Sequence, residues 1–179
     1  MKIIKKIIIV LFVLVAITLV IALFVKKDYA VVRSIEINKP RTEIFAYTKY
    51  LKNQANFSKW AAMDPAMEKT YRGTDGEVGF VSAWKSKVKD VGAGEQEILK
   101  ITENERLDFE LRFLEPFEAK EAAYMTFDSL EENQTKVSWG FNGHMDYPMN
   151  IFLLFMDFDK MIGADLETGL KNLKTVMEK

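Results

Sequence analysis

Six strand-like segments follow one another between Met67 and Met145, and only short turns separate them. The clearest is RLDFELRF, residues 106–113, in which Leu107, Phe109 and the next two odd positions alternate with charged side chains. Strands joined by such short turns must pair antiparallel. Each strand has a single apolar face, so the sheet needs a cover on that face only. The predicted strands are residues 67–72, 78–87, 95–102, 106–113, 119–127 and 135–145.

The predicted cover is one long helix at the C-terminus. Its apolar side chains recur at helical spacing and form a single stripe; they are Ile162, Leu166, Leu170, Leu173 and Met177. Two glycines, Gly163 and Gly169, lie inside this helix, although each costs about 1 kcal/mol relative to alanine. Gly169 falls on the stripe, so we expect the helix to approach the sheet closely there. Gly163 lies off the centre of the stripe and is interpreted as a joint. A β-sandwich, the competing architecture, would leave this helix without a partner.

The segment before the six strands adds a strand and two short helices. Residues 31–37 alternate as a half-buried strand, and Pro40 suits the first turn of the helix that follows. A second short helix is predicted over residues 56–62. The predicted fold class is therefore α+β, with a seven-stranded antiparallel sheet, two short helices between its first and second strands, and the terminal helix.

Residues 7–25, IIIVLFVLVAITLVIALFV, are apolar except for Thr18. A helix needs about 20 such residues to cross a bilayer core of about 30 Å. We therefore predict a single-pass N-terminal transmembrane anchor over residues 1–27, followed by one domain of about 150 residues over residues 28–179. A cleavable signal peptide is the alternative, but the run ends without a convincing cleavage site. More positive charge precedes the span than follows it, so we expect the domain to lie outside the cytoplasm.

Composition argues against several classes of function. A net charge of −1 lacks the basic excess of a nucleic-acid-binding protein. The chain has no cysteine, and its single histidine, His144, cannot build an ordinary transition-metal site. The sequence contains no nucleophile elbow, P-loop, dinucleotide-binding or zinc-protease motif. We therefore predict no metal, no cofactor and no nucleic-acid partner, and we expect His144 to be exposed and non-catalytic.

The order of these elements resembles the START-like (SRPBCC) superfamily, which includes the polyketide cyclase/dehydrase and lipid-transport proteins and the birch-pollen-allergen group. Five local stretches carry the resemblance: IEINKPRTEIF (35–45), FSKW (57–60), VGFVSAWKSK (78–87), GAGEQEI (92–98) and MDFDKMIGADLETGLKNLK (156–174). The resemblance covers residues 31–177. It implies the helix-grip fold, in which a curved sheet wraps around the C-terminal helix and an elongated cavity lies between them.

The resemblance also places a set of inward side chains on the cavity wall, each with packing in the solid core as its competing interpretation. They are Trp60, Phe80, Trp84, Phe109, Phe113, Met125, Phe127, Trp139, Phe141, Phe155 and Ile162. Ser82 shares the inward parity of Phe80 and Trp84 and would add one polar group. The apolar run 149–158 is expected at the cavity mouth, either as a plug of the core or as a lid that admits a ligand or touches the membrane.

Three functions remain open from the sequence. The first is a membrane-anchored binding module that holds a lipid or other hydrophobic small molecule in the cavity. The second is a polyketide cyclase/dehydrase-like enzyme that uses the same cavity, although the chain carries no catalytic motif. The third is an interaction protein of the cell envelope whose cavity is filled.

Overall fold

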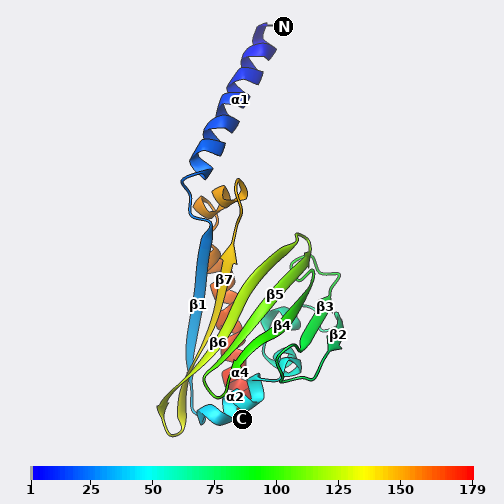
Figure 1. The fold of residues 1–179 in the computed structure, drawn as a ribbon, viewed down its shortest axis with the longest axis vertical. Coiled ribbons are helices and arrows are strands. Elements are labelled where there is room, and N and C mark those ends of the chain that lie inside the picture. The colour runs from blue at the N-terminus through cyan, green and yellow to red at the C-terminus, as the bar shows by residue number, and fades with distance from the viewer. Residues whose placement is uncertain (1) are drawn as a thin grey trace.

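The computed structural model describes residues 2–179, and it contains one curved sheet, a long helix on its concave face and an N-terminal helix that projects away from both (Figure 1). The strands are β1 (Asp28–Ile37), β2 (Glu68–Arg72), β3 (Val81–Lys85), β4 (Ala93–Thr102), β5 (Arg106–Glu115), β6 (Ala119–Glu131) and β7 (Gln134–His144). The helices are α1 (Lys2–Ala22), α2 (Arg41–Thr48), α3 (Lys59–Met63) and α4 (Phe158–Met177), with the 3-10 helices η1 (Leu51–Asn56) and η2 (Met149–Leu154).

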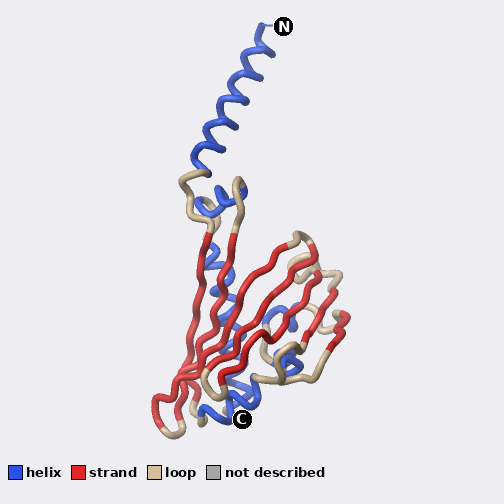
Figure 2. Tube along the Cα trace, viewed as in Figure 1, coloured by secondary structure: helices blue, strands red, loops and turns tan. Residues whose placement is uncertain are grey.

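The sheet order is β1-β7-β6-β5-β4-β3-β2, and every neighbouring pair is antiparallel. The helices α2, η1, α3 and α4 all lie on one side of this sheet (Figure 2). The predicted helix-grip fold is therefore confirmed. Several boundaries differ from the prediction by a few residues. The strand expected over residues 78–87 is shortened to β3 because Gly76 and Gly79 both adopt a φ of 86° in the preceding turn. The helix expected over residues 56–62 is reduced to α3, and the separate 3-10 helix η1 precedes it.

The apolar stripe of α4 packs into the concave face of the sheet, mainly along β1. Leu166, Leu170 and Leu173 are 2%, 1% and 0% exposed, respectively. The close approach expected at Gly169 is present, since a Cβ added there would lie only 2.8 Å from Cζ3 of Trp139 on β7. Glycine at this position therefore allows α4 to lie against the sheet.

Gly163 has a different role from the predicted one. Helix α4 runs through this residue without a break, so Gly163 is not a joint. The guanidinium of Arg33 on β1 lies over it, and a Cβ there would come within 2.1 Å of Arg33 Nη2. The same guanidinium donates hydrogen bonds of 2.8 and 2.9 Å to the carboxylate of Asp159 in the first turn of α4. The missing side chain at Gly163 makes room for an ion pair that joins α4 to β1.

The N-terminal helix α1 has a mean hydropathy of 2.8 over its most apolar stretch, none of which is buried. Its length and composition are sufficient to cross a membrane. The end of α1 contacts η2, where the buried Asn150 side chain donates hydrogen bonds of 2.8 and 2.9 Å to the carbonyls of Ala22 and Val25. No residue of the run 149–158 borders the helix–sheet cavity, where the sequence had placed this run as a core plug or a lid. Asn150 holds the run beside the end of α1 instead.

Candidate ligand cavity

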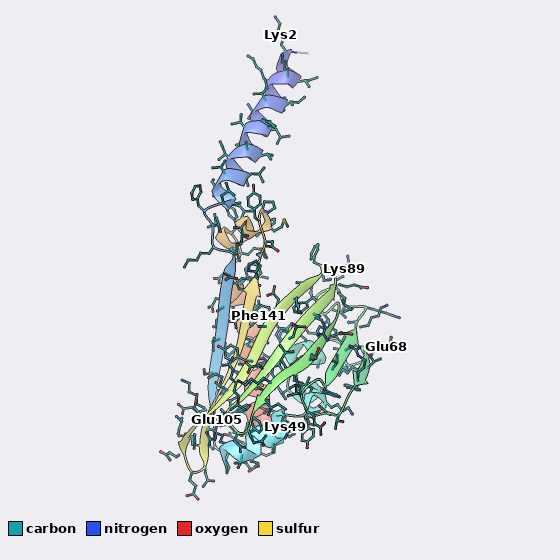
Figure 3. All side chains as sticks on the ribbon, in the orientation of Figure 1. Lys2, Lys49, Glu68, Lys89, Glu105 and Phe141 are labelled. Carbon is teal, nitrogen blue, oxygen red and sulfur yellow. The ribbon has the colours of Figure 1, made fainter. Side chains whose placement is uncertain are left out.

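The concave face of the sheet is not filled completely, and a cavity of about 400 Å³ remains between strands β2–β7 on one side and η1, α3 and α4 on the other. Its wall includes Lys89, which Figure 3 places at the end of the sheet nearer α1, and Phe141 on β7. The wall also includes Leu51 and Lys52 of η1, so short helices and sheet enclose the space together. This volume is within the range of sites that bind small molecules.

Most of the wall is apolar and aromatic. Six of the eleven residues that the resemblance implied as liners lie there: Trp60, Trp84, Phe113, Trp139, Phe141 and Ile162. Two edge-to-face aromatic pairs hold the shape of the wall. Trp60 and Trp139 have ring centroids 6.3 Å apart at an interplanar angle of 78°, and Trp84 and Phe113 are 6.2 Å apart at 80°. These rings give the cavity a rigid apolar surface.

Four of the expected liners belong to the solid core instead. Phe80, Phe109, Met125 and Phe127 are each 1% exposed and do not border the cavity. Their inward parity is as expected, but parity does not give the position along a strand. For example, Phe127 packs edge-to-face against Phe45 of α2, with ring centroids 5.4 Å apart. The helix α2 therefore fills this end of the concave face.

The fifth exception, Phe155, lies just after η2 and is 80% exposed. It does not border the cavity, because η2 is held against the end of α1 rather than over the sheet. A second, open hollow of about 740 Å³ lies in this region between α1, β1 and η2. Phe24 and Leu154 are among the residues that line it.

The polar part of the cavity wall is small. Ser82 lies on the wall, at the inward parity that the sequence indicated, and Gln96 lies beside it on β4. Gln96 was not among the predicted liners, although it has the same parity as the buried Ile98 and stands between two outward glutamates. Asp165 of α4 also borders the cavity, where it forms an ion pair with Lys59 of α3.

No protein-family model matches this sequence, and no curated protein matches it either. Solved structures do match. Ara h 8.0201 superposes with a TM-score of 0.57 at 11% identity, over 84% of this chain and 98% of that one. Protein CV1439 from Chromobacterium violaceum gives 0.59 at 12% identity, over 84% and 97% of the two chains. The di-domain ARO/CYC StfQ from the steffimycin biosynthetic pathway gives 0.64 at 7% identity, over 85% of this chain and 51% of StfQ. The chain has the START-like (SRPBCC) helix-grip fold.

The outer face of the START-like sheet is charged and solvated, as the alternation predicted. Arg112 of β5 is at its centre and donates hydrogen bonds to Glu95 and Glu97 of β4 and to Glu110 of its own strand. These carboxylates raise the pKa of Arg112, and the bonds from Arg72 and Arg112 lower the pKa of Glu95. The network stabilises the sheet from outside and takes no part in the cavity.

His144 ends β7 outside the cavity and is exposed, as expected. Its ring nitrogens lie 2.6 Å from Asp28 Oδ1 and 3.3 Å from Asp146 Oδ1. Hydrogen bonding to Asp28, and then to Asp146, raises the pKa of His144. The nearby carboxylate of Glu121 accepts the backbone N–H of His144, while burial raises the pKa of Glu121. These residues join the ends of β1, β6 and β7.

Proposed function

We propose that this protein is a membrane-anchored binding module that holds a lipid or other hydrophobic small molecule between its sheet and α4. The observation that carries the proposal is the cavity of about 400 Å³, whose wall is built mainly from aromatic and aliphatic side chains. A close-packed domain of this size normally leaves no such space in its core. An apolar space of this volume with a few polar groups is typical of a ligand site.

Membrane attachment is the second part of the proposal, with residues 1–27 as the anchor and residues 28–179 as the binding domain. Its support is the apolar surface of α1, which is exposed along most of the helix, together with the lysines before and after the apolar run. The bias of those lysines favours a domain on the outer side of the membrane. Strand β1 begins at Asp28, so little chain separates the domain from the anchor.

Exposed apolar side chains beside the end of α1 fit the same arrangement. Phe24 and Phe155 are 85% and 80% exposed, and Leu154 is 56% exposed. An exposed apolar cluster of this kind is unfavourable in water but stable at a membrane surface. Since Asn150 ties η2 to the last turn of α1, these side chains would rest in the interfacial layer of the bilayer.

The test compares two matched variants of the full chain. Ala123 lines the cavity and is 5% exposed, whereas its neighbour Ala122 points to the outer face. The protein is incubated with a total lipid extract and examined by native mass spectrometry after release from detergent. Wild type and Ala122→Phe should retain a bound apolar molecule, and Ala123→Phe should lose it because the new ring occupies the cavity. An empty wild-type protein would refute the proposal.

A catalytic role of the cyclase type for the same cavity is the second candidate. The observation that favours it is Asp165, a carboxylate on the cavity wall. One of its carboxylate oxygens is already engaged by Lys59, so we place binding first. If the bound molecule changes mass on incubation with wild type but not with Asp165→Asn, the cavity is an active site. The third hypothesis, a filled cavity, does not fit the open space.

A further inference from the structure

One level of the sheet carries a row of inward hydrogen-bonding side chains. Tyr71 on β2 pairs with Ser82 on β3, which pairs with Gln96 on β4, which in turn pairs with Leu111 on β5. All four residues border the cavity. A phenol, a hydroxyl and a carboxamide therefore stand side by side on a wall that is otherwise mostly apolar.

The side chains of Ser82 and Gln96, the two central members of this row, have no hydrogen-bond partner within the described residues 2–179. Gln96 is only 8% exposed, yet neither its carboxamide nor the hydroxyl of Ser82 forms a side-chain hydrogen bond there. Among residues 2–179, Asn150 Oδ1 is the one side-chain polar atom that is both fully enclosed and without a hydrogen-bond partner. The unbonded polar atoms of Gln96 and Ser82 are therefore not fully enclosed. Their polar atoms therefore face the cavity.

A carboxamide that faces free space from an apolar wall has hydrogen-bonding groups that no part of the wall uses. Such a group is kept where something outside the chain completes its hydrogen bonds. The opposite wall offers a further group of the same kind, since Ser58 is 9% exposed and its side chain does not cap α3. Polar groups thus reach the cavity from both the sheet and the helices.

We propose that Gln96 and Ser82 are the specificity-determining pair of the cavity, and that they bind an uncharged hydroxyl group of an otherwise apolar ligand. The inference rests on the proposed function. A carboxamide and a hydroxyl each both donate and accept, which matches an alcohol that does the same. The rings of Trp84, Phe113 and Trp139 then receive the apolar body of the ligand. Charged residues also border the cavity, and among them Asp165 forms an ion pair with Lys59. The strand neighbours of Gln96 are Ser82 and Leu111, neither of which is charged.

Decanol and undecane test the pair, because they have the same number of heavy atoms and differ only in the hydroxyl. Each competes with the neutral fluorescent dye N-phenylnaphthylamine for the full chain in lipid nanodiscs, with empty nanodiscs subtracted. Wild type should bind decanol more tightly than undecane. Gln96→Met should weaken decanol binding about tenfold, the ratio that corresponds to about 1.4 kcal/mol, and should leave undecane binding unchanged. Ser82→Ala should act in the same direction by a smaller factor.

Gln134→Met is the matched control, since it makes the same substitution on β7 outside the cavity and should have no effect. If the dye binds but both ligands compete equally in wild type and Gln96→Met, ordered water completes the hydrogen bonds and the inference is wrong. If decanoate competes better than decanol, the group recognised is charged and the inference is again wrong. If wild type fails to bind the dye at all, the proposed function itself is refuted.

Discussion

Replacing Gly169 tests how closely α4 lies against the sheet. An alanine Cβ at this position would lie 2.8 Å from Cζ3 of Trp139 and 3.5 Å from the carbonyl oxygen of Phe57. The first distance is shorter than van der Waals contact, so the indole must move. Its ring is also packed edge-to-face against Phe57 and Trp60, at centroid distances of 5.8 and 6.3 Å. A shift of Trp139 therefore disturbs both neighbours.

Two opposing effects set the magnitude. Alanine gains about 1 kcal/mol over glycine from helix propensity, and overpacking of a core costs about 1–3 kcal/mol. Gly169→Ala should therefore lower the free energy of unfolding by about 0–2 kcal/mol. Gly169→Leu adds three more carbons against the same ring and should lower it by about 3 kcal/mol or more. Without the contact, both variants would be more stable than wild type.

Urea denaturation of the detergent-solubilised full chain, followed by tryptophan fluorescence, measures these values. Thr168→Ala is the control, because Thr168 is the exposed neighbour on the same helix and should gain a few tenths of a kcal/mol from propensity alone. Trp139→Phe removes the ring atom that clashes. In that background Gly169→Ala should stabilise, giving a coupling of about 1 kcal/mol or more. Strictly additive effects, or a Gly169→Leu protein as stable as wild type, would refute the reasoning.

Three further predictions concern polar contacts. Asp28 raises the pKa of His144 above 6.5, so their ion pair stabilises the fold fully below pH 6.5 and is lost as the pH rises through the folded-state pKa. The difference in urea midpoint between wild type and His144→Gln should therefore shrink as the pH rises through this window. A difference that stays constant would contradict the assignment. Asn150→Ala removes the donor to the carbonyls of Ala22 and Val25. Hydrogen exchange in η2 should therefore become faster by a factor that corresponds to about 1–3 kcal/mol, and Asn142→Ala, at an exposed position, is the control. Arg112→Met leaves three carboxylates facing one another, so its loss of stability should grow as salt is lowered; salt independence would show that they do not interact.

The sequence by itself determined the elements and the faces they present. Alternation in residues 106–113 gave a strand with one apolar side, and the stripe from Ile162 to Met177 gave the helix that covers it. These patterns are local, because the period of a strand or helix decides which side chains share a face. Short turns then left antiparallel pairing as the one possibility. The fold could therefore be predicted from sequence and from the resemblance together.

Which inward side chains border the cavity was decided only by the tertiary structure. Phe109 and Phe113 share a strand and a face, yet Phe109 is enclosed in the solid core and Phe113 borders the cavity. The difference arises because α2 packs into one end of the concave face, whereas η1 and α3 enclose the cavity with the sheet. This is a long-range arrangement that parity does not contain.

The same holds for contacts between distant segments. Asn150 bonds to Ala22 at the end of α1, 128 residues away. Arg33 on β1 occupies the space above Gly163 and pairs with Asp159 of the same helix, 126 residues away. Gln96 looked like one more polar residue of a charged strand until its neighbours Ser82 and Leu111 showed that it faces the cavity. Periodicity assigns a side chain to a face, but only the packing of the whole chain decides what that face meets.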